Sequence, residues 1–394
     1  MTPEPPATAS GAPTTLRLGT RGSALALAQS GQVARALEAA HPGLRVELVP
    51  IVTRGDRLPG DLAAFGGKGL FTEELERGLL DGSLDLAVHS LKDLPVALPA
   101  GLIIAAHPPR ADPRDVLVSA VAASLDALPA GAVVLTGSLR RRALLLLRRP
   151  DLRVEPLRGN VDTRLRRWRD SGAAGVVLAS AGLARLGLLA AADLPALPLT
   201  PVDRPAPEGP AGERSAAAPP AGLPAYPLPP EVLLPAPGQG TLALEVRAGS
   251  RAEHLCRTLN DPATAAAAAA ERQVVAAFGG DCTLPLAAWA RWEADPAGQA
   301  PEPKPGPATA PPAPRSAAGI LRLTALIATP DGRHAARGEA AGSSPEEVAA
   351  ACIALLRDDG AEAVLARVRA AQAERAEQSE PGSGVPGGQA TGAP

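Results

Sequence analysis

Residues Val133–Leu165, VVLTGSLRRRALLLLRRPDLRVEPLRGNVDTRL, contain two strand–loop–helix units in direct succession. Short runs with Val and Leu at 133–136 and 154–157 are typical of strands, and apolar residues at helical spacing follow at 139–149 and 161–170. A strand followed by a helix and then by another strand favours a parallel sheet with helices on its faces. This stretch therefore predicts an α/β fold.

The same alternation extends on both sides of this stretch. We expect strands at 16–19, 46–52, 84–89, 116–119 and 176–178, and helices at 23–40 and 70–80. Beyond a strand at 242–246 and helices at 251–259 and 264–278, the order changes to strands at 284–290, 320–328 and 334–339 and helices at 345–356 and 361–373. The chain is therefore predicted to form two α/β domains, with ligands at the carboxyl ends of their strands, and a smaller α+β domain at the C-terminus.

Length and low-complexity segments predict the domain organisation. The 394 residues correspond to two or three domains at about 100–200 residues each. Residues 200–230 and 297–318 are rich in Pro, Ala, Gly and Glu and almost lack large apolar side chains, so we expect disordered inserts there, and disordered tails at 1–15 and 377–394. The expected domains are 16–110 with 240–258, 111–199 with 231–239, and 259–376.

Charge and cysteine content argue against several classes of protein. Lys and Arg number 39 and Asp and Glu 41, which leaves a net charge of −2 and no global attraction to nucleic acid or to an anionic membrane. The N-terminus lacks the pattern of a secretory signal and no uncharged segment is long enough to span a bilayer, so we expect a cytoplasmic protein. The three cysteines and five histidines lack the spacing of disulfide or metal sites.

Basic residues recur in loops next to strands and helices. Five such loops are TRGS (20–23), GGKG (66–69), SLKD (90–93), TGSLRR (136–141) and LRGNVDTR (157–164). Helix N-termini offer free N–H groups and a positive dipole end, and arginine can bind a carboxylate through two hydrogen bonds. The alternative for any single arginine is a solvated helix face. If the two α/β domains face each other, these loops line one cleft, and the expected ligand is a small polyanion.

Asp93 and Cys282 stand apart from the other acidic residues and cysteines. Asp93 follows Lys92 in a basic loop, where a carboxylate can stabilise positive charge that develops on a substrate; the alternative is a surface ion pair. Cys256 and Cys352 lie in helical patterns, which is typical of small buried hydrophobic residues. Cys282 follows Gly-Gly-Asp in a loop, where its thiolate could serve as a nucleophile or a covalent attachment point.

Eleven stretches of the chain resemble the porphobilinogen deaminase (hydroxymethylbilane synthase) family and occur in the family's order. They are RLGTRGSALALAQ, VTRGD, GGKGLFTEELE, DLAVHSLKDLP, DPRDVLVS, TGSLRRR, RPDLRVEPLRGNVDTRL, LASAGLARLGL, LPAPGQGTLALEVR, AAAERQVV and GGDCTLPLA. The resemblance extends over the chain except for the two low-complexity inserts and the tails.

The resemblance implies a transferase that joins four porphobilinogen molecules head to tail into the linear tetrapyrrole hydroxymethylbilane and releases ammonia. It also implies a dipyrromethane cofactor attached to Cys282 through a thioether, and a monomeric protein. Each pyrrole of such a ligand carries an acetate and a propionate, which agrees with the basic loops found above.

The resemblance also implies roles for individual residues. Asp93 would be the catalytic carboxylate, which stabilises positive charge on the pyrrole nitrogen as ammonia leaves. The residues implied to bind carboxylates of the cofactor are Lys92, Ser138, Arg140, Arg141 and Arg164. The residues implied to bind incoming pyrroles are Arg21, Ser23, Gln29, Lys68, Arg158, Arg185 and Gln239.

Two other functions are alternatives to this enzyme. Two periplasmic-binding-protein-like α/β domains would also suit a non-enzymatic two-lobed anion-binding protein, but that class has no use for Cys282 in a loop. An arginine-rich RNA-binding protein would have a basic isoelectric point, whereas the value for this chain is about 6.3. We therefore expect porphobilinogen as the partner, and neither nucleic acid nor a membrane.

Overall fold

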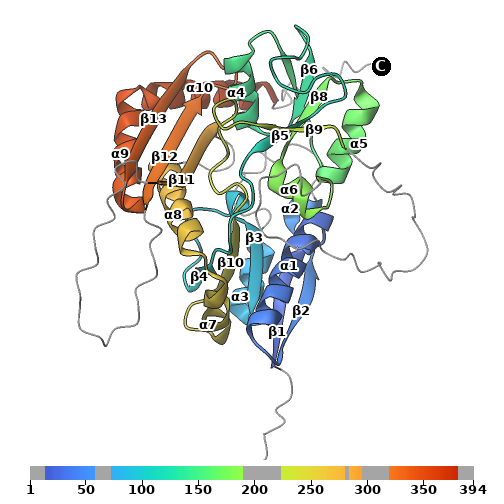
Figure 1. Cartoon of the computed structure of the whole chain (residues 1–394), viewed down its shortest axis with the longest axis vertical. Coiled ribbons are helices and arrows are strands. Elements are labelled where there is room, and N and C mark those ends of the chain that lie inside the picture. Colours follow the sequence, from blue (N-terminus) through green and yellow to red (C-terminus); the bar gives the residue numbers. More distant parts are fainter. Residues whose placement is uncertain (1–13, 58–71, 190–222, 280–283, 295–318, 380–394) are drawn as a thin grey trace, which may run out of the picture.

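The computed structural model describes residues 14–57, 72–189, 223–279, 284–294 and 319–379. These residues form three sheets, two with five strands and one with three (Figure 1). The five-stranded sheets combine parallel and antiparallel pairs, and the third sheet is antiparallel throughout. The prediction of two α/β domains and a smaller α+β domain is confirmed.

The first α/β domain has a sheet with the strand order β2-β1-β3-β10-β4. Its strands are β1 (Thr14–Arg21), β2 (Leu44–Ile51), β3 (Leu86–Ser90), β4 (Leu102–Ala106) and β10 (Leu242–Arg247). Its helices are α1 (Ala24–Ala40), α2 (Arg54–Arg57), α3 (Glu73–Asp81) and α7 (Arg251–Cys256). β1 is parallel to β2 and β3, whereas β10 returns from far along the chain and lies antiparallel to β3 and β4.

The second α/β domain repeats this plan with the strand order β7-β6-β8-β5-β9. Its strands are β5 (Asp115–Val118), β6 (Val133–Thr136), β7 (Arg153–Pro156), β8 (Gly175–Ala179) and β9 (Ala225–Leu228). Its helices are α4 (Leu139–Arg148), α5 (Val161–Ser171) and α6 (Ser180–Arg185). β5 arrives from the first domain and lies antiparallel to β8 and β9, as β10 does between its own neighbours. Each α/β domain therefore contains one strand that directly follows a passage of the chain from the other domain: β10 in the first domain and β5 in the second.

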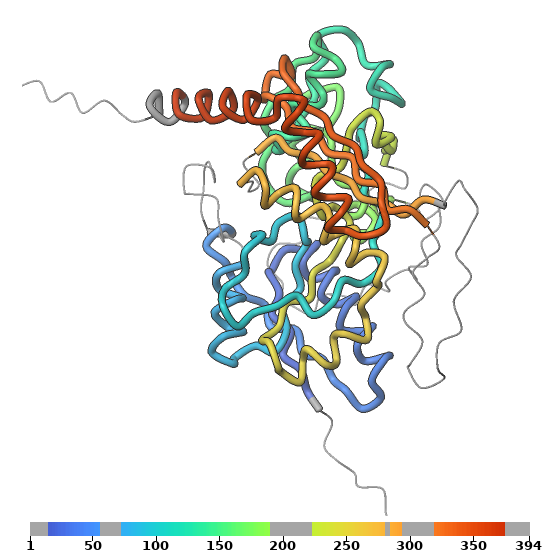
Figure 2. The backbone as a smooth tube through the Cα atoms, turned by 90° about the vertical axis from the view of Figure 1, so that its left-hand side faces the viewer, coloured from blue at the N-terminus to red at the C-terminus, as the bar shows by residue number. Residues whose placement is uncertain are grey.

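The third domain has the sheet β11 (Leu286–Ala294), β12 (Gly319–Ala328) and β13 (Ala335–Gly342). Helices α8 (Pro262–Ala277), α9 (Pro345–Asp358) and α10 (Ala361–Ser379) accompany it, and α9 and α10 lie on its outer side, toward the viewer in Figure 2. Ala287, Trp289 and Leu326 instead pack against the core of the second domain. This sheet thus joins the third domain to the second.

Several stretches differ from the sequence-based expectation. We expected residues 200–230 to be a disordered insert, but Ala225–Leu228 forms β9, so the expectation is wrong for these residues. Pairing with β5 satisfies the backbone N–H and C=O groups of these residues, and this distant partner cannot be recognised from the local composition. β4, α2 and α6 are not predicted from the sequence. The expected tails are also too long: β1 begins at Thr14, within the tail expected at 1–15, and α10 continues to Ser379, past the expected start of the tail at 377. The remaining insert and tail residues lie largely outside the described ranges, and the domain boundaries otherwise stay a prediction.

The chain crosses between the two α/β domains at 107–114 and at 235–241, and these crossover segments touch. The backbone N–H of Ala111 donates to the carbonyl of Gly240 at 3.2 Å. Gly240 has a φ of +87°, and a Cβ on it would lie 2.3 Å from the Ala111 carbonyl oxygen. Only glycine fits this position without displacing the crossover backbone.

Glu271 of α8 ties both crossover segments to the third domain. Its fully buried carboxylate accepts hydrogen bonds from Arg110 Nη1 at 2.6 Å, from the backbone N–H of Gly238 at 2.6 Å and from that of Ala290 at 2.7 Å. A buried carboxylate with this many donors is compensated in charge and fixed in direction. The three domains therefore meet at one residue.

Among the described helices, none combines the length and apolar character needed to cross a membrane.

We expect Gly240→Ala to destabilise the protein more than Gly249→Ala. Both glycines have a positive φ, but a Cβ at Gly249 would meet nothing within 4 Å. The left-handed conformation alone should cost about 1–2 kcal/mol in each variant. Overpacking against Ala111 should add about 1–3 kcal/mol for Gly240→Ala. Denaturant unfolding of the two variants measures the difference, and equal midpoints would contradict this account of the crossover.

Candidate functional site

The N-terminus of α4 carries two of the predicted arginines. Ser138 is the N-cap, and its hydroxyl accepts a hydrogen bond from the backbone N–H of Arg141 at 3.3 Å. Serine is favoured at this position because it satisfies a backbone donor that the helix leaves unpaired. Gly137 lies so close to Leu157 that a Cβ would be 2.5 Å from its carbonyl oxygen. The loop after β6 therefore packs directly against the loop after β7.

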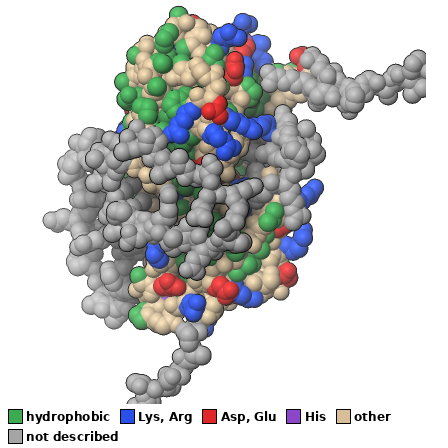
Figure 3. Space-filling model, turned by 90° about the vertical axis from the view of Figure 1, so that its right-hand side faces the viewer, with side chains coloured by type: hydrophobic (Ala, Val, Ile, Leu, Met, Phe, Trp, Pro, Cys, Tyr) green, Lys and Arg blue, Asp and Glu red, His purple; other side chains and the backbone are tan. Residues whose placement is uncertain are grey.

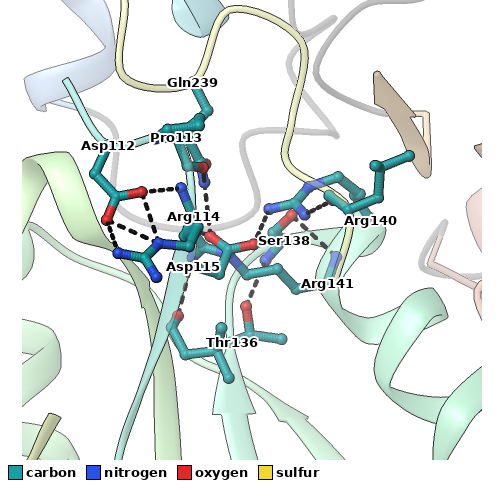
Figure 4. Close-up of polar contacts among 11 residues, drawn as sticks. Asp112, Pro113, Arg114, Asp115, Thr136, Ser138, Arg140, Arg141 and Gln239 are labelled. Carbon is teal, nitrogen blue, oxygen red and sulfur yellow. Dashed lines mark hydrogen bonds and ion pairs between the residues drawn. The ribbon is translucent and has the colours of Figure 1, made fainter. Parts of the chain in front are cut away.

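Arg140 and Arg141 are buried, and both bind the carboxylate of Asp115 at the start of β5 (Figure 4). Arg140 Nη2 donates to Asp115 Oδ2 at 2.7 Å, and Arg141 donates to Oδ1 from Nε at 3.0 Å and from Nη2 at 2.8 Å. Gln239 Nε2 donates to the same Oδ1 at 2.9 Å. Burial raises the pKa of Asp115, but the two arginines outweigh it and hold that pKa below its usual value.

Lys92 and Asp93 come from the first domain, in the short 3-10 helix Leu91–Asp93 that follows β3. The N–H of Leu91 donates to the carbonyl of Thr241 at 3.0 Å, and the buried Leu91 side chain contacts Gly238, so this turn rests on the crossover. Asp93 is exposed and Lys92 is half-buried. The segment thus presents one carboxylate and one ammonium group at the junction of the two domains.

The charges of both domains act on Lys92. Burial lowers its pKa to about 8; Arg140 and Arg141 also lower it, while Asp93 and Asp115 raise it. These groups belong to both domains, so charges at the N-terminus of α4 act on the turn after β3 across the junction.

Arg158 lies in the loop between β7 and α5, and Arg164 lies near the start of α5. Asn160 is the N-cap of α5 and accepts from the backbone N–H of Thr163 at 2.9 Å, while Arg164 Nε donates to the carbonyl of Gly159 at 2.7 Å. The pKa of Arg164 is lowered to about 10, mainly by burial and to a smaller extent by Arg141 and Arg158, while Asp93 acts to raise it. Arg164 therefore belongs to the same electrostatic group as Lys92.

We call this group the junction cluster. Its members are Lys92, Asp93, Asp115, Arg140, Arg141, Arg158 and Arg164. Five basic and two acidic side chains leave a positive excess, which can bind several carboxylates of one ligand. Exposed arginines of α5 and of the loop before it also gather on the face of the second domain seen in the upper half of Figure 3.

Three other predicted site residues lie on or near α1. Ser23 is the N-cap of α1 and accepts from the backbone N–H of Ala26 at 3.3 Å, and Arg21 ends β1 just before it. Gln29 is buried, and its Nε2 donates to Ser90 Oγ at 2.9 Å. Gln29 therefore ties α1 to the end of β3, next to the turn that carries Lys92.

Arg185 and Gln239 each have a buried polar atom without a hydrogen-bond partner among the described residues. Arg185 Nη2 donates to the carbonyl of Gly240 at 2.8 Å, but its Nε is unpaired within those ranges, and burial lowers its pKa to about 10. Gln239 donates to Pro113 and Asp115 through Nε2, whereas its Oε1 has no donor in the described parts of the chain. Unpaired buried polar atoms of this kind suit a ligand that supplies the missing partner.

Two predicted site residues, Lys68 and Cys282, lie outside the described residues. The other two cysteines are buried in the cores of the first and third domains, as predicted, and burial raises the pKa of each thiol to about 12. Within the described ranges, no three His, Cys, Asp or Glu side chains are grouped so that they could hold a metal ion.

Sequence reasoning missed Asp115 as a member of the site. Its motif DPRDVLVS contributed to the resemblance but gave no role to this carboxylate. A carboxylate directly before the apolar run at 116–118 was the available signal, because a charge at the start of a buried strand requires a partner.

The chain is similar to a known family and to several of its members. Residues 16–254 match the family model described as porphobilinogen deaminase, dipyromethane cofactor binding domain. The porphobilinogen deaminase of Rubrobacter xylanophilus is 42% identical, covering 90% of this chain and 97% of the relative. That of Syntrophotalea carbinolica is 48% identical, covering 70% of this chain and 78% of the relative. That of Paraburkholderia phytofirmans is 42% identical, covering 84% of this chain and 82% of the relative.

We expect Lys92 to titrate near pH 8 in protein that carries Cys282→Ser, where no ligand can be attached at that cysteine. Its pKa is lowered because burial and the neighbouring arginines destabilise the ammonium form, so Lys92 is charged below about pH 8 and neutral above it. Nuclear magnetic resonance of carbon-13-labelled lysine measures this titration.

The chain is well suited to this measurement because its only lysines are Lys68, Lys92 and Lys304. The spectrum therefore holds few signals, and Lys92→Arg identifies one of them. A pKa at or above the ordinary value of 10.5 would contradict the described surroundings of Lys92.

Proposed function

The chain belongs to the porphobilinogen deaminase family, and we propose that the junction cluster is the centre of its active site. The enzyme joins four porphobilinogen molecules into hydroxymethylbilane with release of ammonia and uses a dipyrromethane cofactor. The function expected from the sequence is thus confirmed, and the non-enzymatic anion-binding alternative is not favoured. The assignment of individual residues is our proposal.

The observation that carries this proposal is the meeting of basic side chains from both domains around Asp93. Each pyrrole carries two carboxylates, so a chain of pyrroles needs several cations within a short distance. Arginine is suited to this task because its planar guanidinium binds a carboxylate through two parallel hydrogen bonds. The charge of the site and the charge of the ligand are therefore complementary.

The donors of the junction cluster, together with the neighbouring Ser138, fit the cofactor. Lys92, Ser138, Arg140, Arg141 and Arg164 would hold its carboxylates, and Arg140 Nε is a buried donor with no partner among the described residues. When bound, the dipyrromethane supplies the pyrrole to which the first substrate is joined. We propose Cys282, from its sequence motif alone, as the attachment point.

We propose Asp93 as the catalytic carboxylate. Its side chain is exposed at the junction, and its charge acts on both Lys92 and Arg164. A carboxylate in this position can stabilise positive charge on a pyrrole nitrogen while ammonia departs, and an arrangement fixed before the reaction gives the largest effect.

Incoming pyrroles would contact side chains that surround the cluster. Arg21, Ser23, Gln29, Lys68, Arg158, Arg185 and Gln239 remain our proposal for this set. Among the described residues, Arg185 Nε has no hydrogen-bond partner and could donate to a carboxylate of the substrate. Gln239 Oε1 also has no partner there, and it could accept from a pyrrole N–H or from the ammonium group of porphobilinogen.

We further propose that the enzyme acts as a monomer in the cytoplasm, without nucleic acid. The monomeric state rests on the resemblance of the sequence to the family. A net charge of −2 supports the absence of a nucleic-acid partner.

Asp93→Asn should lower kcat by about 10²–10³-fold, because the amide cannot stabilise a developing cation as the carboxylate does. Steady-state turnover of porphobilinogen measures the effect. The matched control is Asp126→Asn, which removes an exposed carboxylate paired with Arg148 at 3.0 Å, and it should keep wild-type turnover. Turnover of Asp93→Asn within twofold of the wild type would exclude the proposed role.

Purified wild-type protein should exceed the mass of its polypeptide by two pyrrole units, and Cys282→Ser should lose this excess. Denaturing mass spectrometry compares the two proteins, and native spectra of the same samples should show one chain. Active wild-type enzyme with the bare polypeptide mass would refute attachment at this cysteine. Cys256→Ser, which changes a buried thiol in the first domain, should keep the excess mass.

A further inference from the structure

Asp115 is the only acidic side chain among the described residues that contacts both Arg140 and Arg141 at the N-terminus of α4. Its side chain is fully buried, and each carboxylate oxygen serves a different arginine, Oδ2 for Arg140 and Oδ1 for Arg141. Figure 4 shows the carboxylate between the two arginines and Gln239. One residue thus sets the direction of two guanidinium groups.

The second contacts of the arginines complete this arrangement. Arg140 Nη1 donates to the carbonyl of Leu234, and Arg141 Nη1 donates to the carbonyl of Val177 at 2.9 Å. Carbonyl groups accept hydrogen bonds but do not cancel charge, so among the described contacts of these arginines only Asp115 offsets part of the repulsion between the two buried cations. Without it, two like charges would face each other in a site with little water.

Asp115 also connects the arginine pair to the crossover. Gln239 Nε2 donates to both Asp115 and the carbonyl of Pro113, while Arg185 donates to the carbonyl of the neighbouring Gly240. The position of the crossover and the position of the arginines are therefore linked through one carboxylate.

We propose that Asp115 is a positioning residue of this enzyme: it orients Arg140 and Arg141 for the carboxylates of the oligopyrrole and compensates part of their charge before a ligand arrives. This inference rests on the proposed function of the junction cluster and deepens it. Asp115 touches neither substrate nor cofactor in this role and acts through the arginines. A misplacement of about 1 Å in such groups can cost 10²-fold in rate.

The main test compares Asp115→Asn with Asp85→Asn. Asparagine keeps the size of the side chain and removes its charge. Asp85 is the matched control, since its carboxylate also accepts two hydrogen bonds from one guanidinium, from Arg17 Nε and Nη2 at 3.0 Å each, but in the first domain and outside the junction cluster. Activity is normalised to the fraction of chains that carry the cofactor, measured by mass.

We expect Asp115→Asn to lower kcat/KM by about 10–100-fold and Asp85→Asn to leave it within twofold. Lys92 provides a readout that a purely structural role would not move. Asp93, Asp115, Arg140 and Arg141 all act on Lys92, and loss of the Asp115 charge should shift its titration to lower pH. Wild-type kcat/KM together with an unchanged Lys92 titration in folded Asp115→Asn would overturn the proposal.

Two further outcomes separate possible failures. If Asp115→Asn does not fold, Asp115→Glu takes its place, because it keeps the charge and displaces it by one methylene. Folded Asp115→Glu with wild-type kcat/KM would then refute positioning, whereas a lowered value with an unmoved Lys92 titration would support it. If the wild type itself does not consume porphobilinogen, the proposed function fails, while the Lys92 titration still reports on Asp115.

Discussion

Compensation of like charges at the domain junction is the constraint on which this structure depends. Binding a ligand with many carboxylates requires several cations close together, and such cations repel one another until the ligand arrives. The buried Asp115 offsets this repulsion between Arg140 and Arg141, and the charge of the exposed Asp93 stabilises the charged forms of Lys92 and Arg164. Asp115 is buried and orients the two arginines, whereas Asp93 is exposed at the junction, where we propose that it stabilises positive charge on the substrate.

The scaffold brings these groups together by exchanging strands between its domains. β5 and β10 each enter a sheet antiparallel to its neighbours, and the segments that lead to them form the crossover. Asp115 begins one of these strands and Gln239 precedes the other, while Glu271 secures the crossover from the third domain. The site is therefore built on the only two places where the chain passes between the α/β domains within the described residues.

Much of the fold and part of the site could be predicted from local patterns. The runs at 133–136 and 161–170 became β6 and α5 almost residue for residue, because alternating strand and helix signals are strong where turn residues separate them. The loops that carry Lys92, Arg140 and Arg164 were found for the same reason. β9 was missed because four residues in a stretch rich in proline and alanine have little strand signal and depend on pairing with β5. Asp115 was missed because its partners are far away in the sequence.

The amino-acid sequence by itself determined the family, the alternation of strands and helices, and the residue types of the site, since these follow from spacing and chemical identity along the chain. Only the tertiary structure decided which charges face each other. Arg140 and Arg141 could have pointed at solvent or at ligand, but the arrival of β5 beside β8 places Asp115 against both of them. Likewise Gln29 proved to be bonded to Ser90, a contact between residues 61 positions apart. Such contacts depend on how distant segments pack, and a local pattern carries no record of that packing.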